Sequence, residues 1–366
     1  MDQLPAFPWD SLADAKATAA AHAGGIVDLS VGSPIDPTPR ILQDALAAAS
    51  DAPTYPTCWG TPALRDAIVD WFARVRGVPG LGHANVMPTV GSKETVAGLP
   101  LWLGLGAGDV VVHPSVAYPT YDIGARVAGA TPVPADDPDD WPEGTRLVWV
   151  NSPSNPTGDV ASVETLRRIV ERARAIGAVV ASDECYALLP WDADEVPSIL
   201  DPRVAGGSRE GLLVVHSMSK QSSIAGYRAA FLAGCATLVG RVLEVRKHIG
   251  LIPPAPVQHA MAVGLPDDAH VAEQRERYRA RRAVLRRALE AAGFDVRGAA
   301  GLYLWATDGR GAREQVADLA AHGILVAPGD FYGDDRRVRV ALTASDERIA
   351  EAATRLAGYR PLRRTT

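Results

Sequence analysis

The fold of this chain is decided by the stretch Ser217-Met218-Ser219-Lys220, which follows the apolar run Leu212-Leu213-Val214-Val215-His216. A continuous apolar run of this length predicts a short buried strand. A lysine at the end of such a strand can lose part of its hydration, which lowers its pKa and frees a neutral amine to bond to a carbonyl compound. Arg228 follows eight residues later, and together with the two serines it could hold a phosphate. Taken alone, the stretch fits a surface lysine better than a reactive one.

Length and composition allow two domains and exclude several classes of partner. The chain has 366 residues, of which 47% are apolar and 22% are charged, as in an ordinary soluble globular protein. The formal net charge of -6 argues against a nucleic acid or an anionic membrane surface as a partner.

The cysteines and histidines predict neither disulfides nor a metal site. Cys58, Cys185 and Cys235 are odd in number and lack a CxxC spacing, so we expect a reducing, cytoplasmic setting. The eight histidines lack the HExxH spacing of a zinc site. We expect no membrane role, because the N-terminus lacks the pattern of a signal peptide and the uncharged stretch 95–107 is too short to span a bilayer.

Residues from about 86 to 235 alternate between short apolar strands and helical segments such as Ser162–Ile176. This alternation predicts an α/β fold whose mostly parallel sheet is covered by helices on both faces. The predicted strands are Val110–His113, Leu147–Val150, Ala178–Ala181, Leu212–His216 and Ala229–Ala233.

A long helix over 267–292 separates this region from a smaller α+β unit. Arginines recur along the helix, but glutamates alternate with them, so a solvated face is a better interpretation than a nucleic-acid-binding helix. We therefore expect an N-terminal arm and part of the small domain in residues 1–40, a large domain in 41–265, and a small domain in 266–366 that begins with the bridging helix 266–292.

Polar residues follow three of the predicted strands. The segments are Asn151–Gly158, Ser182–Tyr186 and Ser217–Lys220. In open α/β sheets the ligand binds outside the carboxyl ends of the strands, so the three segments should converge. One Asn-Pro pair alone would be a turn, and one Asp-Glu pair alone a helix cap.

These segments carry a family resemblance that covers nearly the whole chain. The motifs are Asn155-Pro156-Thr157-Gly158, Asp183-Glu184-Cys185-Tyr186, and Ser217-Met218-Ser219-Lys220 with Arg228. The chain resembles the fold-type I aminotransferases of class I/II, which depend on pyridoxal 5'-phosphate (PLP). The resemblance implies a large domain with a mostly parallel sheet, a smaller α+β domain, and a homodimer.

The resemblance also implies catalytic roles. Lys220 would be the Schiff-base lysine, which holds the cofactor and then moves a proton to and from the substrate. Asp183 would pair with the pyridine nitrogen and keep it protonated, so that the ring can accept electrons. Asn155 and Tyr186 would hydrogen-bond the phenolic oxygen of the cofactor.

Other positions match the family's phosphate and ring contacts. Ser217 and Arg228 match positions that bind the phosphate. The turn Gly91-Ser92-Lys93 would cap the phosphate at a helix N-terminus, although Lys93 departs from the small residue common in the family. Tyr118 would stack on the pyridine ring.

The remaining matches concern substrate and partner. Gly32, Asn155 and Arg339 would contact the substrate, and Arg339 would bind its α-carboxylate. A charged residue inside an apolar strand needs a partner, which supports this role. Tyr55 would reach the phosphate of a neighbouring subunit.

Shorter patterns resemble the actinobacterial N-succinyldiaminopimelate aminotransferases of lysine biosynthesis. Examples are Val31-Gly32-Ser33-Pro34 and the stretch 327–333. The resemblance favours N-succinyl-LL-2,6-diaminopimelate and 2-oxoglutarate as substrates, with a general glutamate-dependent aminotransferase as the alternative. Both readings require a second site for a distal carboxylate. The candidates for this cationic or hydrogen-bonding site are Arg246, Lys247 and His248, with Trp59 and Tyr332 as flat walls.

Four other interpretations of the sequence compete with this one. Ser217-x-x-Lys220 also matches penicillin-binding proteins and class A β-lactamases, but the Ser-Asp-Asn and Lys-Thr-Gly motifs are missing. The glycines of 104–108 have the wrong spacing for a dinucleotide loop. A ligand-sensing regulator would need a DNA-binding domain ahead of the fold, and only about 25 residues precede it. Another PLP reaction, such as β-elimination of the C–S lyase type or ring closure, uses the same fold.

Overall fold

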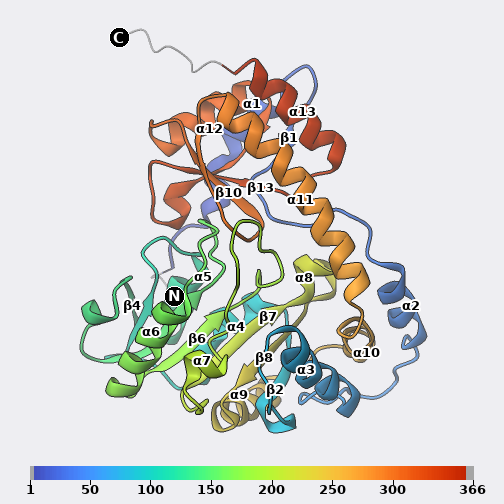
Figure 1. The fold of residues 1–366 in the computed structure, drawn as a ribbon, viewed down its shortest axis with the longest axis vertical. Helices are drawn as coiled ribbons and strands as arrows, with labels where there is room; N and C mark the ends of the chain where they lie inside the picture. Colours follow the sequence, from blue (N-terminus) through green and yellow to red (C-terminus); the bar gives the residue numbers. More distant parts are fainter. Residues whose placement is uncertain (1–3, 360–366) are drawn as a thin grey trace.

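A seven-stranded sheet lies at the centre of the larger part of the molecule in the computed structural model, which describes residues 4–359 (Figure 1). The strand order is β2-β8-β7-β6-β5-β3-β4, and β8 runs antiparallel to both of its neighbours while the other pairs are parallel. The strands are β2 (Val86–Val90), β3 (Val110–His113), β4 (Thr131–Pro134), β5 (Thr145–Asn151), β6 (Val179–Asp183), β7 (Leu212–Ser217) and β8 (Ala229–Gly234). The predicted α/β class is confirmed.

The sequence predicted five of these strands and missed the two at the edges of the sheet. β2 contains Pro88, and β4 contains Pro132 and Pro134. Proline lacks the backbone N–H that a central strand needs, so it is confined to edge strands and weakens the strand pattern there.

Helices cover both faces of this sheet. Successive side chains of each strand point to opposite faces, so one strand contributes to the apolar clusters on both sides. Val148 and Val150 of β5 belong to the cluster formed with α3, α6 and α10, whereas Leu147 and Trp149 belong to the cluster formed with α4, α5 and α9. The helices of this part are α2 (Arg40–Ala48), α3 (Pro62–Val75), α4 (Ser92–Trp102), α5 (Thr120–Ala128), α6 (Val163–Ile176), α7 (Pro202–Ala205), α8 (Met218–Gln221), α9 (Ala236–Ile249) and α10 (Ala255–Gly264).

A smaller group of strands and helices lies above the large sheet in Figure 1. Its antiparallel sheet has the order β12-β13-β10-β9, and β1 near the N-terminus pairs in parallel with β11. The strands are β1 (Val27–Asp28), β9 (Asp295–Arg297), β10 (Tyr303–Thr307), β11 (Ile324–Leu325), β12 (Ala327–Pro328) and β13 (Val338–Ala341); the helices are α1 (Ala13–Ala20), α12 (Ala312–Ala321) and α13 (Asp346–Ala357). The short 3-10 helices are η1 (Pro8–Leu12), η2 (His83–Asn85), η3 (Pro138–Asp140), η4 (Ala225–Tyr227) and η5 (Gly329–Tyr332).

The long helix α11 (Asp268–Ala291) runs between the two parts, from beside α10 to beside α13 (Figure 1). Our interpretation of its arginines as a solvated face is only partly correct. Arg281 and Arg282 are buried. Their charges are compensated, since Arg281 is ion-paired with Asp36 and Asp346, and Arg282 with Asp192. Within residues 4–359, no helix is both long and apolar enough to cross a membrane.

Candidate active site

The three polar segments begin at neighbouring positions on the carboxyl edge of the large sheet. Asn151 at the end of β5 is paired with Asp183 at the end of β6, and Asp183 is paired with Val215 of β7, two residues before Ser217. The Asn151 amide also donates to the Asp183 backbone carbonyl (3.1 Å) and accepts from the Asn155 backbone N–H (2.7 Å). The carboxyl ends of β5, β6 and β7 therefore bring the predicted residues together.

Lys220 lies on α8, a single helical turn that follows β7 directly. Ser217 caps this turn, since its hydroxyl accepts a hydrogen bond from the Ser219 N–H at 3.1 Å. The Lys220 ammonium donates to the backbone carbonyl of Gly32, which comes from the N-terminal segment. Burial lowers the pKa of Lys220, because removing the ammonium from water disfavours its charged form. The neutral amine is therefore easier to form here than at an exposed lysine.

Asp183 is buried at the end of β6. Its carboxylate accepts hydrogen bonds from the Tyr121 hydroxyl (3.0 Å) and from the Cys185 backbone N–H (3.1 Å). Burial raises the pKa of Asp183, although both of these hydrogen bonds oppose the change. A buried carboxylate of this kind is stabilised by a cation placed next to it.

Tyr121 was missed by the sequence analysis, which singled out Tyr118 in the same stretch. Tyr121 stacks on Trp149 of β5 with ring centroids 5.0 Å apart and meets the Tyr118 ring edge-on at 5.8 Å. Burial raises the pKa of Tyr118 to about 12. The spacing of three residues places both tyrosines on one side of the start of α5, and this spacing was the available signal.

Two of the predicted phosphate residues, Ser92 and Arg228, lie at the start of α4. Gly91, the residue before the helix, has a φ of 77°, and Ser92 is the first helical residue. A Cβ at position 91 would collide with the Arg228 guanidinium, so glycine allows the arginine to lie against the helix N-terminus. The unpaired N–H groups of the first helical turn and a guanidinium together form an anion site.

For the other two predicted phosphate residues, Ser217 and Lys93, the structure records contacts with residues outside α4. The Ser217 hydroxyl lies 2.8 Å from the Ser219 hydroxyl inside the turn that leads to Lys220. Lys93 is exposed, and its ammonium lies 5.9 Å from the centroid of the Phe7 ring. The Lys93 side chain thus contacts the N-terminal segment.

Arg339 of β13 is buried, with 3% of its surface exposed. Its guanidinium donates to the Asn155 side-chain oxygen (3.0 Å) and to the Ser30 backbone carbonyl (2.7 Å), and its carbon lies 3.9 Å from the Tyr303 ring centroid and 4.8 Å from that of Tyr332. Among the described residues no carboxylate is ion-paired with Arg339, and its Nε has no hydrogen-bond partner. A buried cation without an anion suits a carboxylate ligand.

Tyr303 of β10 is a further residue of the site that the sequence analysis did not identify. Its hydroxyl lies 3.2 Å from the hydroxyl of Tyr186 and directly against Gly32, where any side chain would collide with it. Burial opposes ionisation of Tyr303, but the charges of Arg339 and Lys220 more than offset it and lower its pKa. Tyr303 therefore connects Tyr186, the N-terminal segment and the two cations.

Tyr55 is 99% exposed, so it contributes nothing to the site within its own chain. Arg246, one of the three cations expected to bind a distal carboxylate, is fully buried, ion-paired with Glu94 and stacked over Trp102. The structure therefore does not support Arg246 as the residue for a distal carboxylate, because the helical periodicity of α9 turns this position inward, where Glu94 pairs with it.

Lys247 and His248 are exposed at the end of α9. Lys247 is ion-paired with Glu244, and its ammonium lies 5.9 Å from the Trp59 ring. Neither of these two cations makes a contact with Arg339 or Lys220 that the structure records.

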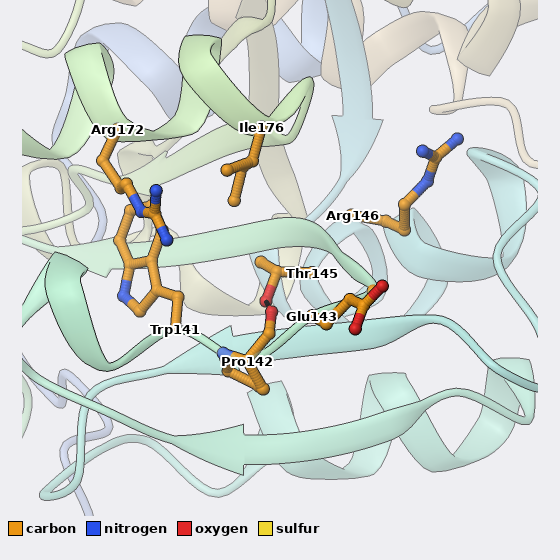
Figure 2. Close-up of a pocket in the computed structure, with 8 residues that line it drawn as sticks. Trp141, Pro142, Glu143, Thr145, Arg146, Arg172 and Ile176 are labelled. Carbon is orange, nitrogen blue, oxygen red and sulfur yellow. Dashed lines mark hydrogen bonds between the residues drawn. The ribbon is translucent and has the colours of Figure 1, made fainter.

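An open pocket lies at the other end of strand β5, on the side of the sheet where the parallel strands begin (Figure 2). It is formed where β5 begins and α6 ends, six residues along β5 from Asn151, or about 20 Å at roughly 3.3 Å per residue. Its lining consists of Trp141, Pro142, Glu143, Gly144, Thr145, Arg146, Arg172 and Ile176. None of the predicted site residues lines this pocket.

Comparison with known proteins gives one consistent family. Residues 25–356 match the family model described as aminotransferase class I and II. A probable aminotransferase of Mycobacterium tuberculosis is 56% identical over 357 residues, which cover 96% of this chain and 85% of the relative. The 4-dedimethylamino-4-oxo-anhydrotetracycline transaminase of Streptomyces rimosus is 54% identical over 360 residues, which cover 97% of this chain and all of the relative.

A solved structure has a similar fold throughout. The N-succinyldiaminopimelate aminotransferase from Mycobacterium tuberculosis superposes with a TM-score of 0.85 at 27% sequence identity, and the match covers 98% of this chain and 100% of the other.

Proposed function

The chain belongs to the class I and II aminotransferases, which use pyridoxal 5'-phosphate, and we propose that it transfers an amino group between N-succinyl-LL-2,6-diaminopimelate and 2-oxoglutarate. The observation that carries amino-acid chemistry at this site is the buried guanidinium of Arg339, which has no carboxylate partner among the described residues. An α-carboxylate would supply the missing anion.

Three features of the site support binding of the cofactor. The α4 N-terminus with Arg228 suits a phosphate, and Gly91 keeps this position clear of a side chain. The buried carboxylate of Asp183 suits a protonated ring nitrogen. The lowered pKa of Lys220 suits covalent attachment of an aldehyde to its amine.

When bound, the cofactor supplies an electron sink that stabilises negative charge at the substrate α-carbon. The chain's own residues do the rest. Arg339 binds and orients the α-carboxylate, while the Lys220 amine takes a proton from the substrate α-carbon and would return it to the cofactor carbon that bears the transferred nitrogen. Ser92 and Arg228, with Ser217 by the family resemblance, would hold the phosphate and so fix the ring relative to Lys220.

The finer assignment of the substrate rests on similarity. The superposed structure carries the name of an N-succinyldiaminopimelate aminotransferase, and the short patterns around Gly32 and in 327–333 point the same way. The exposed side chains of Lys247 and His248 remain as candidates for the distal carboxylate, because Arg246 is paired with Glu94.

A second candidate follows from the Streptomyces relative, whose name describes transamination of 4-dedimethylamino-4-oxo-anhydrotetracycline. An identity of 54% over the full length of that relative favours a ketone of this kind as amino acceptor. A general glutamate-dependent aminotransferase is the third candidate.

A half-reaction screen tests the diaminopimelate assignment. The cofactor-loaded enzyme is mixed with each amino donor in turn, and the change in the visible spectrum of the bound cofactor is followed. We expect glutamate and N-succinyl-LL-2,6-diaminopimelate to react fastest. A faster reaction with a small neutral or aromatic amino acid contradicts the diaminopimelate assignment, and release of ammonia with a keto acid instead of amino transfer indicates an elimination.

We further propose a homodimer in which Tyr55 serves the partner's site. The supporting observation is the exposure of this large aromatic side chain in a stretch, 51–55, whose residues are all exposed. Tyr55→Ala should weaken cofactor binding in a dimeric enzyme. A fully active monomer at micromolar concentration, measured by sedimentation, contradicts the proposal.

A further inference from the structure

Three side chains form a hydrogen-bonded row that starts at Ser222, the residue that caps the helical turn of Lys220. The Ser222 hydroxyl lies 2.8 Å from His270 Nε2, and His270 Nδ1 lies 2.9 Å from the Asp267 carboxylate. The arrangement has the order of a serine, histidine and aspartate triad. Ser222 is completely buried, however, so no acyl substrate reaches its hydroxyl. The row joins α8, which Ser222 caps, to the first turn of α11, where His270 lies.

A second contact between the same two elements lies two turns further along α11. The Tyr278 hydroxyl donates to the backbone carbonyl of Lys220 at 3.3 Å. Tyr278 is completely buried, and burial raises the pKa of its hydroxyl, so it remains a donor. The Lys220 carbonyl is one of those that a helix of four residues cannot satisfy by itself.

A third connection passes through the N-terminal segment. Ser223 has a φ of 49°, which is unfavourable for a residue other than glycine, and its hydroxyl donates to the Asp36 backbone carbonyl at 2.6 Å. The Asp36 carboxylate accepts from Gln274 and Arg281 of α11, both at 2.8 Å. Burial opposes ionisation of Asp36, but these hydrogen bonds lower its pKa and keep it charged. Helix α11 thus holds the turn on both sides of Ser222.

We propose that α11 is the positioning element for Lys220, and that His270 and Tyr278 are positioning residues for its amine. The inference rests on the proposed function, in which Lys220 is the reacting lysine. Residues on one helix bind the lysine turn at its carbonyl and at its cap, so the orientation of the helix that runs between the two parts of the molecule fixes the direction of the amine (Figure 1). A displacement of about 1 Å at a reacting group can cost roughly a hundredfold in rate.

The test uses the cofactor-loaded enzyme and the variants Tyr278→Phe, His270→Gln and Ser222→Ala. The matched control is Thr145→Val, which removes another buried hydroxyl, bonded to the Pro142 carbonyl at 2.7 Å, at the opposite edge of the sheet. Two quantities are measured: kcat and KM for the amino donor, and amide hydrogen exchange of the peptide that spans 218–224.

We expect Tyr278→Phe and His270→Gln to lower kcat about tenfold or more while KM stays within about twofold, because the donor contacts Arg339 and not the lysine turn. Exchange across 218–224 should become faster in these variants and unchanged in Thr145→Val, since only the former lose contacts to this turn. A loss of general stability alone would affect all four variants alike.

The proposal is overturned if Tyr278→Phe, which preserves the ring, shows wild-type kcat and wild-type exchange over 218–224. If His270→Gln does not fold, the kcat and the exchange of Tyr278→Phe test the proposal by themselves. Failure of the proposed function is recognised separately, because Lys220→Ala would then retain amino transfer whatever α11 does.

Discussion

The two ends of strand β5 differ in how the protein treats charge and polarity. At the amino end, Glu143 and Arg146 line an open pocket, and Arg146 is mostly exposed, 3.8 Å from Asp109 (Figure 2). At the carboxyl end, Asp183 is buried next to Asn151, and Arg339 is buried nearby without an ion-paired carboxylate in residues 4–359.

The two ends differ in whether water or a ligand compensates the charged groups. Water solvates the groups at the amino end, so their ion pairs contribute little to stability. At the carboxyl end burial removes water, and an isolated buried charge costs several kcal/mol by the usual scale. A fold that keeps such groups at one end of a strand leaves them for a ligand, and substitutions at the two ends should therefore have very different effects.

The largest effect is expected for Lys220→Ala. Removing the amine removes both the attachment point of the cofactor and the group that moves the proton, so kcat should fall by about 10⁴-fold or more. Steady-state turnover measures the loss. Borohydride reduction of the wild-type enzyme followed by peptide mapping should place the cofactor on Lys220.

The control for this variant is Arg146→Ala at the other end of the sheet, which should leave turnover unchanged. Cofactor mapped to Lys93 or Lys247 would contradict the assignment of Lys220.

Asp183→Ala should lower kcat by roughly 10²- to 10³-fold, the usual loss when one preorganised electrostatic group is removed. The cofactor should still attach to Lys220, because the loss concerns charge stabilisation and not binding of the aldehyde. Single-turnover kinetics with a fixed amino donor measures the effect. The exposed acid Glu143, changed to glutamine, is the matched control, and near-normal turnover of Asp183→Ala would show that this carboxylate has no role in the reaction.

Arg339→Met should lower kcat/KM by about a hundredfold, because truncating one partner of a buried charge pair typically costs 2–5 kcal/mol. The same change should not lower the melting temperature, since the unliganded protein loses a buried cation that no anion compensates. Thermal unfolding without substrate measures this second effect. A large drop in melting temperature would mean that Arg339 stabilises the fold, and the contrast between the two ends of β5 would be weaker than we describe.

Much of this site was predictable from the sequence because its residues follow three apolar strands. Asn155, Asp183 and Lys220 lie near strand ends in the chain, and the rule that ligands bind at the carboxyl edge of a parallel sheet brings them together. The prolines of β2 and β4 hid the edge strands, and the inward direction of Arg246 depends on the packing of α9 against Trp102. The sequence pattern contains neither of these facts.

Tyr303 and Tyr278 could not be predicted for a different reason. Both are tyrosines, with a large apolar ring, in segments that have a clear strand or helix pattern. A core position is therefore the simplest interpretation of each. Their hydroxyls acquire roles only through contacts with distant segments: Tyr303 of β10 meets Tyr186, 117 residues away, and Tyr278 of α11 meets Lys220, 58 residues away. Contacts between distant segments are the information that a single sequence lacks.

The smallest effect is expected for Tyr303→Phe, which separates the hydroxyl of this residue from its ring. The hydroxyl bonds to Tyr186 and lies against Gly32, whereas the ring lies under the Arg339 guanidinium. Loss of the hydroxyl alone should lower kcat/KM about tenfold or less, in line with one neutral hydrogen bond of about 1 kcal/mol. Tyr303→Leu removes the ring as well and should raise KM further, because the cation then loses its aromatic contact. Steady-state kinetics of the two variants with glutamate distinguishes the contributions. Equal KM values for Tyr303→Phe and Tyr303→Leu would show that the ring does not orient Arg339, and that Asn155 and the Ser30 carbonyl hold the guanidinium by themselves.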